Sequence, residues 1–282
     1  MKDNSILDTL IEIALKEDLG DAGDITSNFF IDNNSLSNGT IIAKENCVIA
    51  GSEIAERVFK RLDPNIEVKV ELTSGSIAST GDVIISLSGK SCSILSAERI
   101  ALNFLQRLSG IATITKKYVE AVKETNAKIL DTRKTTPGWR VLEKMAVKSG
   151  GGLNHRMGLF DMAMLKDNHL TNESDPRSLQ QKINAFKKQY PAIRLEVEAD
   201  TLEQVNEFIK MEGVDVILLD NMALTEISEA VSLRRGEIKF EASGGINLDT
   251  VIQYAETGVD LISVGALTHS AVSVDLSLEL ET

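Results

Sequence analysis

The second half of the chain repeats one unit of supersecondary structure. Short apolar runs begin near residues 194, 216, 239 and 261, about 22 residues apart. This interval accommodates one short strand, a helix of about three turns and two loops, which together make the repeating unit of a parallel sheet. Two further apolar runs, at 128–130 and 163–165, precede the series. The sequence therefore predicts six parallel strands, in an open sheet or in a barrel.

A barrel is the better of these two interpretations. No Gly-x-Gly-x-x-Gly follows the first strand, which argues against a dinucleotide-binding sheet. Before residue 110 the pattern mixes helix and strand. Helices are expected around residues 6–14 and 53–62, and strands at 40–50, 66–72 and 83–87. A long helix is expected from residue 94, interrupted at Ser109-Gly110 before a second helix at 115–124.

Composition excludes several classes of protein. Thirty basic and 42 acidic residues give a net charge of −12, which disfavours binding to nucleic acid or to an anionic membrane. The N-terminal residues are acidic and amphipathic and do not resemble a signal peptide, and no apolar run is long enough to span a bilayer. Two cysteines cannot form a disulfide framework. We therefore expect a cytoplasmic protein.

The charge is unevenly distributed along the chain. Residues 131–169 contain seven Lys or Arg against four acids, a net charge of +3, so the remainder carries −15. A basic segment in an acidic protein suggests a small anionic ligand, although a cluster of surface lysines explains the charge equally well. Two of the three histidines, His155 and His169, also lie in this segment.

Polar or glycine residues follow each predicted barrel strand, at the end where barrels carry their active sites. Helix capping explains an Asp or a Ser at such positions, but it does not explain a lysine, a glutamate or an Arg-Lys pair. The strand ends are Asp131-Thr132-Arg133-Lys134, Lys166-Asp167-Asn168, Glu198, Asp220-Asn221, Ser243-Gly244-Gly245 and Gly265-Ala266.

The last two strand ends predict a phosphate site. Glycine turns at helix N-termini offer main-chain N–H groups to an anion, and Ser243-Gly244-Gly245 and Gly265-Ala266 occur in consecutive units. Two ordinary turns remain the alternative interpretation.

Glu198 and Asp220 end neighbouring strands and are expected to hold Mg²⁺, directly or through water. A pair acting in general acid catalysis is the rival role. Glu196, two residues earlier on the same face, is expected to be structural and paired with a lysine in the barrel interior.

Three glycines at 150–152 lead into Asn154-His155-Arg156. Together with Arg133, Lys134 and Lys166, His155 and Arg156 supply several cationic donors, which implies a ligand with more than one anionic group. The histidines show no metal-ligand spacing, and neither cysteine lies beside a candidate base.

The segment DTRKTTPGWRVLEKMAVKSGGGLNHRMGLFDMAMLKDNHL resembles the signature of the quinolinate phosphoribosyltransferase family. The runs SAERIALNFLQRLSGIAT, EVEADTLEQ, ILLDN, EASGGIN and GVDLISVGALTHS resemble that family too, as does the early EDLG…GDIT. The likeness covers nearly the whole chain. One departure is Trp139, where leucine is expected.

The resemblance implies transfer of phosphoribosyl from phosphoribosyl pyrophosphate to quinolinate, with loss of CO₂, giving nicotinate mononucleotide and pyrophosphate for NAD synthesis. It implies Mg²⁺ as the cofactor. It also implies an N-terminal α/β sandwich (1–112), an incomplete six-stranded α/β barrel (113–268) and a C-terminal segment (269–282) that packs back on the first domain. In a homodimer or higher even oligomer, one N-terminal domain would cap the partner's barrel.

Site residues follow from the same resemblance. Arg133, His155 and Arg156 would bind the two carboxylates of quinolinate, with Arg99 supplied across the dimer interface. Lys134, Thr135 and Lys166 would lie near substrate and pyrophosphate. Glu198 and Asp220 would lie near the ribose and metal, and residues 243–245 and 265–266 would hold the 5′-phosphate.

Three rival functions remain open at this point. A paralogous phosphoribosyltransferase would act on another heteroaromatic acid. A sensor on the same fold would bind phosphoribosyl ligands without catalysis. A barrel aldolase would use Lys166 as a Schiff-base nucleophile.

Overall fold

The computed structural model describes residues 4–170 and 175–281, and it divides into two compact units that are treated separately below. The first comprises Met1–Ile114, Val141–Gly151 and Ala271–Thr282. The second comprises Thr115–Arg140 and Gly152–Ser270. Each unit therefore combines segments that are distant in the sequence.

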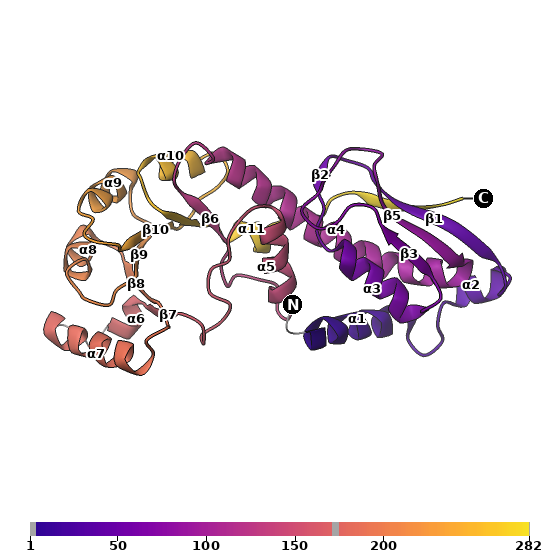
Figure 1. The fold of residues 1–282 in the computed structure, drawn as a ribbon, viewed down its shortest axis with the longest axis horizontal. Helices are drawn as coiled ribbons and strands as arrows, with labels where there is room; N and C mark the ends of the chain where they lie inside the picture. Colours follow the sequence, from indigo (N-terminus) through magenta and orange to yellow (C-terminus); the bar gives the residue numbers. More distant parts are fainter. Residues whose placement is uncertain (1–3, 171–174, 282) are drawn as a thin grey trace. The chain divides into compact units, whose positions relative to one another are not determined.

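The first unit is built on an antiparallel sheet in the order β12-β1-β5-β3 (Figure 1). Its strands are β1 (Leu36–Ala43), β3 (Glu67–Val70), β5 (Val83–Lys90) and β12 (Leu276–Leu280), and a small second sheet pairs β2 (Cys47–Val48) with β4 (Ile77–Ala78). The helices that begin in this part of the chain are α1 (Asn4–Leu19), α2 (Ile25–Phe30), α3 (Ser52–Leu62) and α4 (Ser91–Ala121).

One predicted strand and one predicted helix break are wrong. The expected strand at 40–50 is two strands, β1 and β2, in different sheets, because the polar residues Lys44–Asn46 are exposed and turn the chain between them. The expected break at Ser109-Gly110 does not occur, and α4 runs through both residues.

Gly110 is needed for close packing and does not end the helix. A Cβ atom at this position would lie only 2.0 Å from the main-chain oxygen of Val272. The chain before β12 therefore runs against the bare backbone of α4, where only glycine leaves room. Arg107, one turn earlier on α4, donates a hydrogen bond to the main-chain oxygen of Ala271 at 2.6 Å.

The second unit contains six parallel strands in the order β6-β11-β10-β9-β8-β7, with helices around the outside (Figure 1). The predicted α/β class and six-stranded barrel are confirmed. The strands are β6 (Lys128–Leu130), β7 (Ala163–Leu165), β8 (Leu195–Ala199), β9 (Val216–Asp220), β10 (Lys239–Ser243) and β11 (Leu261–Ser263). The helix α5 (Arg140–Ser149) belongs to the first unit from Val141 onward. The helices after it, in the described part of the second unit, are α6 (Asp167–Leu170), α7 (Pro176–Gln189), α8 (Leu202–Phe208), α9 (Leu224–Ser232), α10 (Val251–Glu256) and α11 (Ala266–His269).

The barrel is incomplete between β6 and β7, which stand at opposite ends of the strand order. Leu153 forms a parallel bridge with Leu130 of β6, and its main-chain N–H donates to the oxygen of Ile129 at 2.8 Å. The segment after the glycine run thus lies along the free side of β6. Its next residues, 154–156, follow the end of β6 into the predicted site.

Candidate active site

The carboxyl ends of the barrel strands meet at one edge. Ser243 of β10 is in register with Asp220 of β9, and Leu219 is in register with Ala199 of β8. Glu198, Asp220 and Ser243 therefore lie at the same edge of the sheet, as the parallel pairing requires. Lys166 follows the end of β7, the neighbour of β8, at this edge too.

Lys166 and Glu198 form an ion pair between Nζ and Oε2. The Glu198 side chain is 10% exposed and the Lys166 side chain 42%. The main-chain N–H of Lys166 donates to Nδ1 of His169 at 3.1 Å, which fixes the chain just after β7. The pair thus presents an ammonium group at the barrel edge and keeps one carboxylate beside it.

The turn after β10 contains two glycines with positive φ angles. Gly244 and Gly245 have φ angles of +104° and +61°. A Cβ at Gly244 would lie 2.1 Å from Oδ1 of Asn221, whose main-chain N–H donates to the oxygen of Ser243 at 2.9 Å. Only glycine fits at position 244, because the main chain there packs directly against the side chain of Asn221 in the turn after β9.

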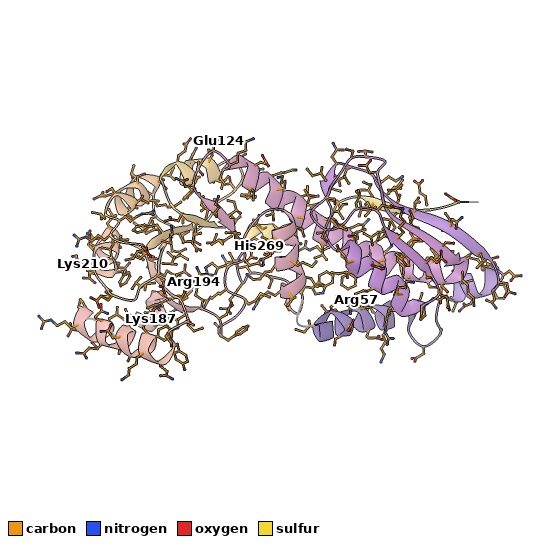
Figure 2. All side chains as sticks on the ribbon, in the orientation of Figure 1. Arg57, Glu124, Lys187, Arg194, Lys210 and His269 are labelled. Carbon is orange, nitrogen blue, oxygen red and sulfur yellow. The ribbon has the colours of Figure 1, made fainter. Side chains whose placement is uncertain are left out.

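The turn after β11 brings Lys134 to the same region of the second unit. A Cβ at Gly265 would lie 3.0 Å from Cδ of Lys134 and 3.2 Å from the ring of His269, a side chain that is labelled in Figure 2. The hydroxyl of Thr268 donates to the main-chain oxygen of Lys134 at 2.7 Å. Gly265 and Ala266 start α11, so Lys134 lies beside the second predicted phosphate turn.

Asp131 joins two parts of the basic segment, residues 131–135 and residues 154–156. Its side chain is buried at the end of β6. Oδ1 accepts the main-chain N–H of His155 at 2.9 Å, and Oδ2 accepts the side-chain amide of Asn154 at 2.5 Å. Residues 131–135 and 154–156 are therefore held together, although the sequence separates them by about 20 residues.

Arg140 makes a second connection between these segments. Its Nε donates to the hydroxyl of Thr135 at 3.1 Å, and its Nη2 donates to the main-chain oxygen of Arg133 at 3.3 Å. Its Nη1 donates to the main-chain oxygen of Met157 at 3.0 Å. Arg140 thus holds main chain on both sides of the predicted anion site, and Thr135 contacts this arginine.

The positive charges of Arg133 and Arg156 act on one another. Burial lowers the pKa of Arg156, and the charge of Arg133 lowers it further. Arg156 also donates to the main-chain oxygen of Met162 and to Sδ of Met164, both at 3.4 Å. Two neighbouring guanidinium groups are unfavourable alone and become favourable when an anion with two carboxylates lies between them.

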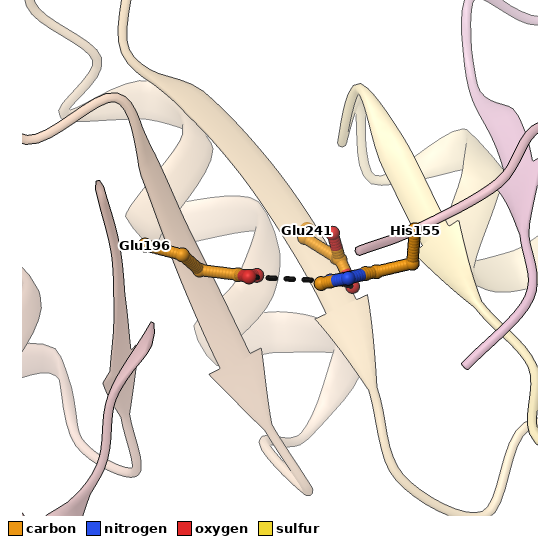
Figure 3. A group of neighbouring side chains, drawn as sticks. All are labelled: His155, Glu196 and Glu241. Atoms are coloured by element: carbon orange, nitrogen blue, oxygen red, sulfur yellow. Dashed lines mark ion pairs between the residues drawn. The ribbon is translucent and has the colours of Figure 1, made fainter. Parts of the chain in front are cut away.

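His155 lies between two buried glutamates in the barrel interior (Figure 3). Its Nε2 is 3.2 Å from Oε2 of Glu196 and 3.4 Å from Oε1 of Glu241. The expected partner of Glu196, an interior lysine, is therefore wrong, because the ring of His155 fills that place. Glu241 has no role in the sequence-based prediction, although it precedes Ser243 by two residues just as Glu196 precedes Glu198.

The protonation of this group follows from its contacts. Burial and the charge of Glu241 raise the pKa of Glu196 to about 7. Burial lowers the pKa of His155, but the two glutamates outweigh burial and raise the pKa overall. His155 therefore favours its charged form more strongly than a free imidazole does, and Glu196 favours its neutral form more strongly than a free carboxyl does.

A metal ion does not fit this group, although His155, Glu196 and Glu241 form the one set of three or more potential ligands in the described part of the chain. The main-chain N–H of Arg156 donates to Nδ1 of His155 at 2.7 Å. Nε2 faces the two carboxylates, and the raised pKa of the ring means that this nitrogen keeps its proton. A metal would need a lone pair on Nε2.

The structure leaves the predicted roles of Arg99 and His155 open. Arg99 is exposed on α4 in the first unit, and its assignment across a dimer interface stays a prediction. The expectation that His155 binds substrate also stays a prediction; in the structure its ring nitrogens face the main-chain N–H of Arg156 and the carboxylates of Glu196 and Glu241. Asp131 and Arg140 were visible in the sequence as members of the basic segment, yet only the structure shows their connecting role.

Across residues 4–170 and 175–281, no helix is both long and apolar enough to cross a membrane.

Comparison with known proteins places the chain in one family. Residues 24–109 match the N-terminal domain of quinolinate phosphoribosyl transferase, and residues 111–279 match its C-terminal domain. The chain is 39% identical over 288 residues to "Quinolinate phosphoribosyltransferase [decarboxylating] 1b" of Nicotiana tabacum, which covers 97% of this chain and 82% of that protein.

Two bacterial proteins are similar over most of their length. A "Probable nicotinate-nucleotide pyrophosphorylase [carboxylating]" of Bacillus subtilis (strain 168) is 41% identical over 268 residues, which covers 94% of this chain and 90% of that protein. The solved structure of the nicotinate-nucleotide pyrophosphorylase from Francisella tularensis superimposes with a TM-score of 0.91 at 37% identity, covering 99% of this chain and 97% of that one. On these matches and the geometry above, the chain belongs to the quinolinate phosphoribosyltransferase family.

Proposed function

We propose that this chain transfers phosphoribosyl from phosphoribosyl pyrophosphate to the ring nitrogen of quinolinate. The product loses CO₂, which leaves nicotinate mononucleotide and pyrophosphate for NAD synthesis. The observation that carries the proposal is that Asp131 and Arg140 hold together the two segments that carry Arg133 and Arg156, in the same unit as Lys166 and the glycine turns. Quinolinate has two adjacent carboxylates, which match two planar donors.

The side chains in this site work by positioning and by charge. Arg133 and Arg156 fix the pyridine diacid, so that its nitrogen faces the ribose carbon from which pyrophosphate departs. The ammonium groups of Lys134 and Lys166 stabilise the negative charge that develops on the leaving group. Glu198, paired with Lys166, keeps that ammonium group charged and oriented. Decarboxylation then needs no further cofactor, because the ribosylated ring nitrogen is cationic and accepts the electron pair.

The turns at Ser243–Gly245 and Gly265-Ala266 would bind the 5′-phosphate. The positive φ angles of Gly244 and Gly245 expose main-chain N–H groups, and glycine at 265 leaves room beside Lys134.

Mg²⁺ is the proposed cofactor, held by Glu198 and Asp220 directly or through water. The donor set supports this, because both groups are carboxylates at the ends of neighbouring strands, and Mg²⁺ prefers oxygen ligands shared with substrate phosphates. When bound, the ion would neutralise charge on the diphosphate.

The proposal extends to assembly and location. In a homodimer or higher even oligomer, Arg99 would reach the quinolinate site of the partner. A cytoplasmic location also stays a prediction from the sequence.

The decisive experiment combines the protein with Mg²⁺, phosphoribosyl pyrophosphate and carboxyl-labelled quinolinate, and measures released CO₂. We expect CO₂ and nicotinate mononucleotide in equal amounts, and none when Arg156→Ala replaces the wild type. Nicotinate serves as the matched control substrate, since it lacks the carboxylate that is lost. Turnover of nicotinate or of another heteroaromatic acid, with quinolinate inert, would favour the paralogous transferase.

A further inference from the structure

A cavity of about 160 Å³ lies between helix α7 and the strands β7 and β8 (Figure 1). Successive side chains of a strand point to opposite faces of the sheet. Met164 of β7 faces the barrel interior, because its sulfur accepts a hydrogen bond from the guanidinium of Arg156. Its neighbours Ala163 and Leu165 therefore face outward, and both line the cavity. The cavity thus lies on the other face of the sheet from the site described above.

The wall of this cavity is mostly apolar. Its members on α7 are spaced by four and three residues, so they form one face of the helix. Ala163 and Leu165 are only half-buried although they face this helix, which shows that α7 does not pack closely against β7. A dry apolar cavity of this size accepts a single six-membered ring. The apolar lining residues are Ala163, Leu165, Leu195, Leu179, Ile183 and Phe186.

Two basic side chains complete the lining. His169 and Lys182 are both exposed, so they mark the open side of the cavity. A ligand with an apolar ring and one carboxylate matches this arrangement, with the ring inside and the charge at the mouth. A second carboxylate on the ring would be buried among apolar side chains, which is unfavourable. The chemistry of the cavity therefore favours a monocarboxylic acid and disfavours a pyridine diacid.

His169 connects the cavity to the other face of the sheet. Its Nδ1 accepts the main-chain N–H of Lys166 at 3.1 Å, which leaves Nε2–H as the donor of the ring. Lys166 in turn forms its ion pair with Glu198. A ligand that shifts the ring of His169 would therefore shift the main chain that carries the Lys166 ammonium group.

We propose that this cavity is a second small-molecule site, which takes a single-ring monocarboxylic acid with its ring under α7 and its carboxylate at His169 and Lys182. We further infer that His169 transmits its occupation to Lys166. The binding site stands on the cavity itself, whereas the transmission rests on the role of Lys166 in the proposed function.

The first test looks for binding with benzoate as the probe. In protein labelled with ¹³C in its methyl groups, benzoate should shift the signals of Leu179 and Ile183, with a dissociation constant below about 1 mM. Ala163→Leu fills the cavity, so it should abolish these shifts and keep or raise the melting temperature. If Ala163→Leu does not fold, Leu179→Phe fills the same space from the helix, and the Ile183 signals then report binding. No shift in wild-type protein at about 10 mM benzoate overturns the proposal.

The second test distinguishes this cavity from the predicted anion site, since Arg156 also attracts carboxylates. We expect the benzoate-induced shifts at Leu179 and Ile183 to persist in Arg156→Ala and to vanish in Ala163→Leu. The reverse pattern would place benzoate in the anion site and overturn the proposal.

The third test concerns the charge at the mouth. Lys182→Gln should weaken benzoate binding about two- to fivefold and leave the binding of toluene unchanged. Lys188→Gln is the matched control, because Lys188 is exposed on the same helix outside the lining. Benzylamine, which carries the opposite charge on the same ring, should bind more weakly than benzoate. Equal affinities for benzoate and benzylamine would contradict the assigned class of ligand.

The last test reads the transmission. Saturating benzoate should change the KM for phosphoribosyl pyrophosphate at least about twofold in wild-type protein and leave it unchanged in Ala163→Leu. The same response in both proteins would overturn the link through His169. If wild-type protein fails to convert quinolinate, the proposed function is wrong, while the methyl signals still decide whether the second site exists.

Discussion

Asp131 offers the sharpest test of how the anion site is assembled. Its buried carboxylate accepts one hydrogen bond from the main chain of His155 and one from the side chain of Asn154. These two bonds join the end of β6 to the loop that carries Arg156. Replacing Asp131 should therefore disturb stability and quinolinate binding together.

The size of the effect follows from the two bonds. A buried hydrogen bond to a charged group contributes about 1.5–3 kcal/mol, so Asp131→Ala should destabilise the second unit by about 3–6 kcal/mol. Asp131→Asn retains one carbonyl acceptor, but its NH₂ group would face the amide of Asn154, whose nitrogen lies 2.5 Å from Oδ2. We therefore expect Asp131→Asn to cost about half as much as Asp131→Ala.

Urea unfolding followed by tryptophan fluorescence measures this cost. Trp139 is the only tryptophan and lies in the second unit, so its signal reports that unit. We expect the KM for quinolinate to rise at least about tenfold in Asp131→Asn, and the exposed Asp249→Asn to serve as a silent control. A loss of under about 1 kcal/mol in Asp131→Ala, with an unchanged KM, would refute the role assigned to this carboxylate.

Three further predictions concern single positions. Gly110→Ala should lower the melting temperature, although alanine favours helices by about 1 kcal/mol, because its Cβ would meet the oxygen of Val272; a higher melting temperature contradicts the close approach. Gly244→Ala should abolish turnover while the protein stays folded by circular dichroism, because of its φ of +104° and the clash with Asn221; normal kinetics would exclude the predicted phosphate turn. Burial raises the pKa of Asp260, but hydrogen bonds from neighbouring basic side chains and a main-chain N–H outweigh burial and lower the pKa overall. The resulting stabilisation is present above about pH 4 and lost as pH falls through the lowered value, so Asp260→Asn should be less stable by about 1–3 kcal/mol at pH 7 and nearly equal to wild type near pH 3. An equal deficit in urea midpoints at both pH values would contradict this.

The barrel could be predicted from the sequence because its strands are short, apolar and evenly spaced. Each predicted strand lies within about one residue of the observed one, since the core side chains themselves define the element. The break at Ser109-Gly110 was wrong for a different reason. A glycine inside a helix indicates either a boundary or a close approach, and Val272, which makes that approach, is distant in the sequence.

The site shows the same distinction. Strand ends located Lys166, Glu198, Asp220 and the glycine turns, because parallel strands must end at one edge. The strand pattern of the sequence does not show which side chains contact one another. Glu196 was placed correctly in the interior, yet its partner comes from a loop whose path depends on the hydrogen bonds of Asp131. The sequence predicts the face of the sheet on which a strand side chain lies, but it does not predict which loop packs against that side chain.

The strand β12 has a consequence for how a newly made chain reaches its final state. It pairs with Gly39–Ala43 of β1, but it leaves the ribosome only after the whole barrel has been synthesised. Until β12 is made, β1 is an unpaired edge strand, and its free main-chain N–H and C=O groups can form hydrogen bonds with other polypeptides. A nascent chain, or a chain that has lost β12, would therefore tend to aggregate through this edge of the first unit's sheet and would need chaperones.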